Sequence, residues 1–113
     1  MAETQFAIES TWHGEILVFE VRGEMDMATS PELVSAVEAM GPGAGHVVVD
    51  LGGTTFLDSA AINGLVRVRR ELDRREVPFN VVSPLDGVVR RALEITNVVD
   101  ELGVVGSRDE AFV

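Results

Sequence analysis

The sequence predicts a single α/β domain over residues 1–113, built on a mixed, mostly parallel sheet of about five strands. Short apolar, β-branched runs alternate with amphipathic segments, a pattern typical of parallel strands joined by right-handed helical crossovers. A chain of 113 residues also suits one domain that buries a core without disulfides or structural metals. The expected order of elements is ββαβαβαβα.

The first two strands are predicted from short apolar runs. Phe6–Ile8 and Ile16–Val21 are rich in strand-forming residues, and the His13-Gly14 pair between them indicates a turn. Residues 22–26, which include a glycine, are expected to leave the second strand as a loop.

A first helix is predicted to begin at Ser30. The serine hydroxyl would cap the free N–H groups of the first turn, and Pro31 suits the first helical position. Glu32 complements the positive end of the helix dipole. Apolar residues follow at helical spacing, and the glycines within residues 41–45 are expected to end the helix.

The centre of the sequence predicts a buried strand followed by a second helix. Val47–Leu51 is a continuous run of mostly β-branched residues, as expected for a strand that is covered on both faces. Residues 52–55 are expected to form a turn, and Phe56–Ser59 leads into the helix. The buried face of this helix is marked by one apolar stripe, at Ile62, Leu65, Val68 and Leu72.

The remaining elements are a strand, a helix, a short strand and a last helix. Residues 78–82 predict the strand, and the third helix is expected to start at Ser83-Pro84. A short strand is expected within Glu101–Val105. Ser107 and Glu110 have the spacing of a capping box, which predicts a short helix at the end of the chain.

The composition excludes several functions. The net charge of −10 argues against nucleic-acid binding, because a phosphate backbone requires a basic surface. The excess of negative charge is unevenly distributed, since residues 1–64 contain ten acidic residues and a single basic residue, Arg22. The absence of cysteine excludes disulfides and zinc–cysteine sites. No apolar run approaches the roughly 18 residues of a membrane span, and the N-terminus lacks the features of a signal peptide, so the sequence indicates a cytoplasmic protein with no membrane partner.

No catalytic constellation is found, and the sequence predicts a protein that is not an enzyme. His13 and His46 lie beside predicted turns and have no partners at the spacing of a metal site or a catalytic triad. No cofactor and no metal are expected. The one enzyme-like alternative is an aspartyl-phosphate site made of Asp50 and Asp58, which are expected at either end of a strand-to-helix loop. Receiver-type phosphotransfer also uses a lysine, however, and all nine basic residues here are arginine.

Ser59 is the residue that sequence chemistry singles out. It is expected to present an exposed hydroxyl at the start of the second helix, where sites gather in open parallel sheets. A phosphate there would meet free backbone N–H groups and the positive end of the helix dipole. It would also add about −1.5 to −2 charges beside Asp58, which would oppose docking of a partner. The alternative is that Asp58 or Ser59 simply caps the helix.

Two motifs carry a resemblance to a known family. One is the apolar strand Val47–Leu51 followed by Phe-Leu-Asp-Ser-Ala-Ala-Ile at residues 56–62, and the other is Val-Arg-Gly-Glu-Met-Asp at residues 21–26. The first is similar to Phe-x-Asp-Ser-Ser-Gly-Leu and the second to Leu-x-Gly-Glu-Leu-Asp, which together resemble the signature of STAS domains. The closest resemblance is to bacterial anti-sigma factor antagonists, and the order of elements agrees over almost the whole chain.

The resemblance implies a regulatory mechanism. In this family the unphosphorylated antagonist binds an anti-sigma factor that is also a serine kinase, an ATPase of histidine-kinase-like fold, and so releases a sigma factor. The kinase phosphorylates the serine after the motif aspartate, here Ser59, which switches binding off, and a serine phosphatase resets the system. The partner-binding residues implied by this carry-over are Asp26, Asp58, Ser59, Ala60, Ala61 and Asn63.

Two residues depart from the family motif. Ala60 replaces the second serine, which leaves Ser59 as the only candidate acceptor there, and Ala61 replaces a glycine whose missing side chain helps a partner to approach closely. A second function stays open, that of a STAS scaffold in a stress-signalling or transporter-associated complex, in which Ser59 is only structural. Binding of a small molecule or nucleotide is a third.

Overall fold

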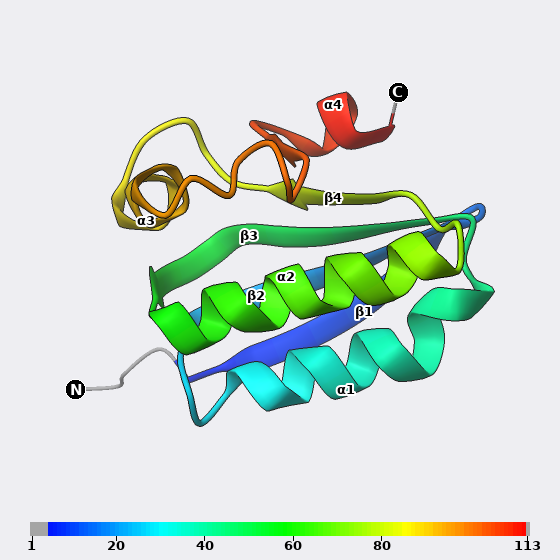
Figure 1. The fold of residues 1–113 in the computed structure, drawn as a ribbon, viewed down its shortest axis with the longest axis horizontal. Coiled ribbons are helices and arrows are strands. Elements are labelled where there is room, and N and C mark those ends of the chain that lie inside the picture. The colour runs from blue at the N-terminus through cyan, green and yellow to red at the C-terminus, as the bar shows by residue number, and fades with distance from the viewer. Residues whose placement is uncertain (1–4, 113) are drawn as a thin grey trace.

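A five-stranded sheet with the spatial order β1-β2-β3-β4-β5 forms the centre of the molecule (Figure 1). The computed structural model describes residues 5–112. The expectation that no signal peptide is present rests partly on residues 1–4, which lie outside this range, as does Val113. β1 runs antiparallel to β2, and each later pair is parallel, so the predicted mixed sheet and element order are confirmed. The elements are β1 (Ala7–His13), β2 (Ile16–Met25), α1 (Ser30–Met40), a 3₁₀ turn (Gly41–Gly43), β3 (His46–Leu57), α2 (Ser59–Arg74), β4 (Phe79–Val82), α3 (Val88–Ile95), β5 (Val104–Val105) and α4 (Arg108–Phe112).

The two faces of the sheet are covered unequally. α1 and α2 lie side by side on one face (Figure 1), where the larger part of the core is buried, including Val49 and Leu65. The short α4 covers the other face, where Val48 and Ala111 belong to a smaller apolar cluster. Neighbouring residues of β3 therefore alternate between two buried clusters, which confirms the expectation drawn from its β-branched run.

β1, β2 and β3 are longer than the sequence predicts. β1 continues to His13, residues 22–25 extend β2, and residues 52–57 extend β3, so the loop and the turn expected there are wrong. The register between β2 and β3 shifts twice over residues 20–24, which marks bulges instead of chain reversals. Gly23 has a φ of +90°, and a Cβ atom there would lie 2.9 Å from a carbonyl oxygen of the N-terminal segment. Glycine here permits irregular strand pairing, where the sequence pattern predicted a turn.

Two helices begin differently from the prediction. α1 starts at Ser30, but Thr29 is its cap residue and the Ser30 side chain is buried, so the predicted capping by Ser30 is wrong. α3 starts at Val88 instead of Ser83. The Ser83 N–H still donates a hydrogen bond to β5, and Gly87, with a φ of +102°, breaks the helical path before Val88.

The N-terminus of α4 is capped by a modified capping box. The Ser107 Oγ accepts a hydrogen bond from the Glu110 N–H at 3.4 Å, as the spacing predicts. The Glu110 carboxylate accepts a hydrogen bond from the Gly106 N–H at 2.8 Å, one residue before the expected donor. Both hydrogen bonds provide acceptors for backbone N–H groups near the helix start, so the motif still caps α4.

Candidate functional site

The predicted site residues lie where β2 and β3 end. These strands are parallel, and Met25 pairs with Leu57, so the segments that follow the two strands leave the sheet at the same edge. Asp26 follows β2, and Asp58 follows β3. The Asp58 N–H donates a hydrogen bond to the Met25 carbonyl at 3.3 Å, which ties the two strand ends together.

Asp58 caps α2 and also fixes the loop that follows β2. Its Oδ1 accepts a hydrogen bond from the Ala61 N–H at 2.9 Å, which satisfies one free donor of the helix start. Its Oδ2 accepts a second hydrogen bond, from the Met27 N–H at 3.1 Å. One carboxylate therefore positions the loop relative to the helix, and the helix cap is Asp58 and not Ser59.

The double role of Asp58 predicts a clear effect on stability. Asp58→Ala is expected to lower the free energy of unfolding by about 1–2 kcal/mol, because it leaves two backbone N–H groups without an acceptor. Asp58→Asn should cost less, since its amide oxygen can still accept from Ala61. Urea denaturation measures both, and Ser59→Ala, expected to change the value by less than about 0.5 kcal/mol, is the control. An equal loss for Ser59→Ala and Asp58→Ala would contradict the assignment of the cap.

Asp26 forms a hydrogen-bonded turn that leads into α1. Its Oδ1 accepts hydrogen bonds from the Ala28 N–H, the Thr29 N–H and the Thr29 hydroxyl, each at 3.0 Å. These bonds, with that of the Thr29 hydroxyl as the largest cause, lower the pKa of the Asp26 carboxyl below its usual value. Asp26 therefore carries a negative charge at neutral pH on the loop that Asp58 positions.

Ser59 is the first residue of α2, and its side chain is exposed. Because Asp58 provides the cap, the Ser59 hydroxyl makes no hydrogen bond within the part of the chain that the structure describes. The first N–H groups of a helix have no partners inside the helix. The site thus combines an accessible hydroxyl with backbone donors that favour an anion.

The other predicted contact residues differ in exposure. Asn63, one helical turn after Ser59, is exposed, and Ala60 is half-buried. Ala61 is completely buried in the core, which corrects the expectation that its side chain lies on a contact surface. The reason is helical geometry, since position 61 points toward the sheet while position 59 points away from it.

Two exposed apolar side chains at this edge were not predicted as site residues. Met27, in the loop that Asp58 positions, is 76% exposed, and Phe56, two residues before Asp58, is 42% exposed. Apolar side chains exposed beside polar ones are typical of protein-binding surfaces. Phe56 could have been identified from strand alternation, because Leu57 faces the core and its neighbour must face away. No comparable signal in the sequence marks Met27.

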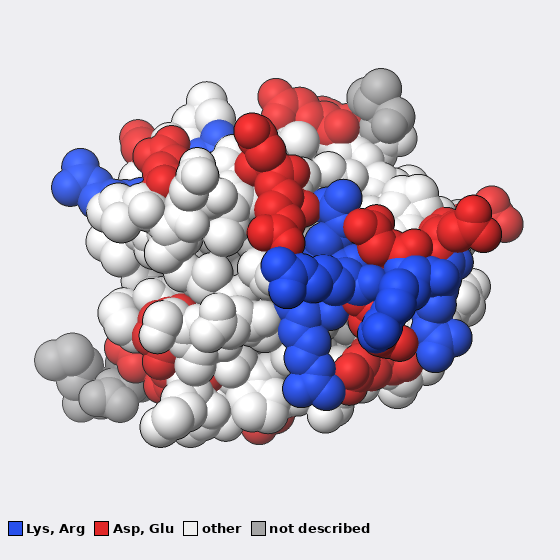
Figure 2. All heavy atoms as spheres, viewed as in Figure 1, with Lys and Arg blue, Asp and Glu red and all other residues white. Residues whose placement is uncertain are grey.

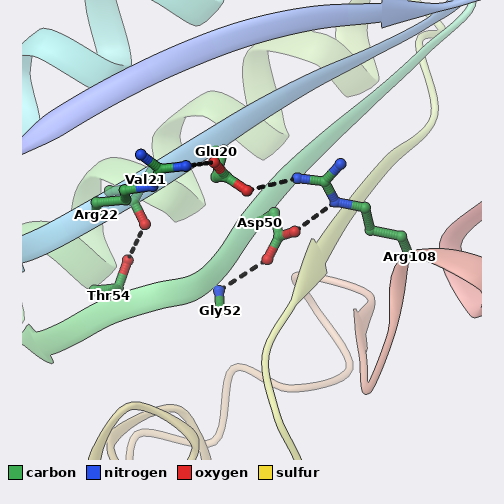
Figure 3. Close-up of polar contacts among 7 residues, drawn as sticks. All are labelled: Glu20, Val21, Arg22, Asp50, Gly52, Thr54 and Arg108. Atoms are coloured by element: carbon green, nitrogen blue, oxygen red, sulfur yellow. Dashed lines mark hydrogen bonds and ion pairs between the residues drawn. The ribbon is translucent and has the colours of Figure 1, made fainter.

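Asp50 does not belong to this site. The extended β3 separates Asp50 from Asp58 by roughly 25 Å of chain. Figure 3 shows the Asp50 carboxylate bonded to Arg108 Nε at 2.6 Å and to the Gly52 N–H at 2.8 Å. The aspartyl-phosphate alternative required the two aspartates to flank one short loop, and the structure does not bring them together.

The chain belongs to the STAS domain family. The model of this family matches residues 7–111, which confirms the resemblance inferred from the sequence motifs. A search among curated proteins gives no match. Over residues 5–112, no helix is both long and apolar enough to cross a membrane. The same residues contain no group of three or more histidine, aspartate or glutamate side chains placed to hold a metal ion.

Solved structures of the same fold include anti-sigma factor antagonists and a sulfate transporter family protein. The chain is similar to an anti-sigma factor antagonist from Mycobacterium paratuberculosis, with 27% identity and a TM-score of 0.86 over 96% of this chain and 92% of that chain. The phosphorylated Bacillus cell fate determinant SpoIIAA is 14% identical, with a TM-score of 0.67 and 96% of both chains covered. A sulfate transporter family protein from Wolinella succinogenes is 13% identical, with a TM-score of 0.73 over 86% of this chain and 81% of that chain. The last two show the shared fold, and the first supports the general role of an anti-sigma factor antagonist.

Proposed function

We propose that this protein is a cytoplasmic anti-sigma factor antagonist whose binding is controlled by phosphorylation of Ser59. The unphosphorylated form binds an anti-sigma factor that is also a serine kinase, an ATPase of histidine-kinase-like fold, and so releases a sigma factor. Phosphorylation of Ser59 ends this binding, and a serine phosphatase restores it. The protein itself catalyses no reaction and contacts neither nucleic acid nor a membrane.

The observation that supports this proposal is the difference between Asp58 and Ser59. Asp58 makes the bonds that hold the helix start and the neighbouring loop, at 2.9 and 3.1 Å. Ser59 is exposed, and its hydroxyl makes no hydrogen bond within residues 5–112. A phosphoryl group on Ser59 would lie at the start of a 16-residue helix, where backbone N–H groups and the helix dipole stabilise a negative charge. The folded domain should therefore tolerate the modification.

The first two turns of α2, next to such a phosphate, contain no arginine. Figure 2 shows that basic side chains gather over the C-terminal half of α2. The first of them, Arg67, lies eight residues after Ser59, about 12 Å along the helix axis. A partner that covers a phosphorylated Ser59 must remove about −1.5 to −2 charges from water without a cation from this helix. Such desolvation costs several kcal/mol, which is enough to end binding.

The proposed contact surface combines charged and apolar residues around Ser59. Asp26 and Asp58 supply charge, and Met27 and Phe56 supply exposed apolar area. The surface continues into a groove of about 440 Å³ between α1 and α2, which borders Ala60 and Asn63. Ala61 contributes only by packing the start of α2 against the core.

Intact mass spectrometry after incubation with ATP and a histidine-kinase-like serine kinase from the same genome tests the proposal. The wild-type chain is expected to gain the mass of one phosphoryl group, and Ser59→Ala is expected to gain none. Ser10→Ala, which removes an exposed serine of β1 outside that surface, is the matched control and should be modified like the wild type. A phosphoryl group on Ser59→Ala, or a kinase that binds the chain without modifying it, would contradict the switch and favour a scaffold role.

A further inference from the structure

β1 forms one edge of the sheet, and within residues 5–112 no strand pairs with its outer side. It pairs with β2 over seven residues without a bulge, whereas the opposite edge strand, β5, has only two residues. Edge strands of natural proteins are usually short, bulged, or protected by lysine or proline, because their free backbone groups attract other strands. β1 has none of these protections, and Glu9 is its only charged residue.

The hairpin between β1 and β2 identifies the backbone groups that point outward. The two strands are joined by Gly14-Glu15, and Gly14 has a φ of +62°, as in the type II′ turn of a two-residue hairpin. In such a hairpin the flanking residues, His13 and Ile16, form a hydrogen-bonded pair, and bonded pairs alternate along the strands. The N–H and C=O groups that point away from β2 therefore belong to Ile8, Ser10 and Trp12.

The side chains of the same three residues lie on one face of β1. Trp12, the only tryptophan of the chain, is 48% exposed, and Ile8 is half-buried. A large aromatic side chain left half uncovered beside an open strand edge is typical of a surface that binds another chain. Ser10 lies between these two apolar residues.

We propose that β1 pairs with β1 of a second copy of this chain, antiparallel and centred on Ser10, so that the two sheets become one. In this register Ser10 faces Ser10, and Ile8 of each copy faces Trp12 of the other. The outward N–H and C=O groups of Ile8, Ser10 and Trp12 in one copy then form hydrogen bonds with those of Trp12, Ser10 and Ile8 in the other. The two Ile8–Trp12 contacts are aromatic–aliphatic cross-strand pairs, which stabilise antiparallel sheets.

Charge favours this register over its neighbours. With Ser10 at the centre, Glu9 faces Thr11, and no two like charges meet within the strand pair. If the centre moved to Glu9, the two Glu9 carboxylates would face each other directly, which is destabilising. If it moved to Thr11, Ile8 would face the glycine of the turn, and both Ile8–Trp12 contacts would be lost.

The proposed dimer leaves the Ser59 surface free in both copies. The main contacts of α2 are with α1, β3 and β4, and β1 is not among them. Because each chain carries a net charge of −10, the two copies repel each other, and association should strengthen as salt screens that repulsion.

Sedimentation velocity of the full chain at increasing concentration and at two salt concentrations tests the proposal. The expected mass rises from 12.2 kDa toward twice that value, more readily at the higher salt concentration, and the Trp12 fluorescence shifts to shorter wavelength with it. Ser10→Pro should weaken the dimer at least tenfold, because it removes an outward N–H that β2 does not use. Ser10→Ala keeps that N–H and should dimerise like the wild type. A monomer at every concentration, or a dimer unaffected by Ser10→Pro, would overturn the proposal.

Cysteine cross-linking tests the register, because the chain contains no cysteine of its own. Under mild oxidation Ser10→Cys should form a disulfide-linked dimer, since the two residues face each other within disulfide reach. Ala7→Cys is the control, because the two Ala7 positions would lie roughly 20 Å apart. Cross-linking of Ala7→Cys as fast as that of Ser10→Cys would contradict the register.

Discussion

Phosphorylation of Ser59 is expected to weaken binding of the kinase by about 100-fold, and Ser59→Asp by at least about tenfold, because each tenfold loss requires only about 1.4 kcal/mol. The reason is that a charge placed on this exposed side chain must lose its water when the partner covers it. No arginine of α2 precedes Arg67, so the same helix offers no cation within its first two turns. Isothermal titration with the purified kinase measures the loss.

A matched variant separates charge from size. Ser59→Asn has nearly the shape of Ser59→Asp without its charge, and it should bind within about threefold of the wild type if charge is the cause. Ser59→Ala should bind continuously in the presence of ATP, because it cannot be modified. Equal losses for the Asn and Asp variants would show that bulk at residue 59 is sufficient, and would contradict the electrostatic explanation.

Hydrophobic patterning allowed the order of elements and the buried strand to be predicted. Val47–Val49 is buried on both faces because neighbouring residues alternate between two clusters, as a continuous β-branched run indicates. The errors arose at residues whose backbone role depends on tertiary pairing. The composition of residues 22–26 and 52–55 predicts a loop and a turn, yet residues 22–25 and 52–55 form bulged strand pairs that only the register of β2 against β3 defines.

The position of Asp58 and Ser59 at the start of α2 could be predicted from the sequence, but the contacts that these residues make could not. The Asp58-Ser59 pair follows from the motif and from helix-capping chemistry, and the structure assigns the cap to Asp58. The bond from the Met27 N–H to Asp58 joins residues 31 positions apart and exists only because two parallel strands end together. A local sequence pattern contains no information about such a contact, which is also why the exposed Met27 was missed.

A cluster of ion pairs outside the proposed contact surface should determine much of the stability. Glu20 and Asp50 are paired residues of the parallel strands β2 and β3, and both side chains lie on the face that α4 covers. Arg108, the first residue of α4, bonds to Glu20 Oε2 at 2.9 Å and to Asp50 Oδ2 at 2.6 Å (Figure 3). Its guanidinium therefore separates two like charges and fixes the last helix to the sheet at the same time.

Arg108→Met is expected to lower the free energy of unfolding by about 2 kcal/mol, because it leaves the nearly buried Asp50 carboxylate without a counter-charge and facing that of Glu20. The value lies below the range for fully buried pairs, since the Arg108 side chain is 33% exposed. For a domain of this size the midpoint of thermal unfolding should fall by about 10 °C. Methionine keeps most of the apolar stem of arginine, so the loss reports on charge more than on packing.

Arg22→Met is the matched control, because Arg22 also pairs with Glu20, at 2.6 Å, but its side chain is 57% exposed. Exposed pairs contribute little, so its loss should stay below about 0.5 kcal/mol. Adding Asp50→Asn to Arg108→Met should restore about half of the free energy of unfolding that Arg108→Met loses. The reason is that the amide can still accept a hydrogen bond from the Gly52 N–H without repelling Glu20. If the two arginine variants lose equal stability, or if Asp50→Asn restores nothing, repulsion between Glu20 and Asp50 is not the cause.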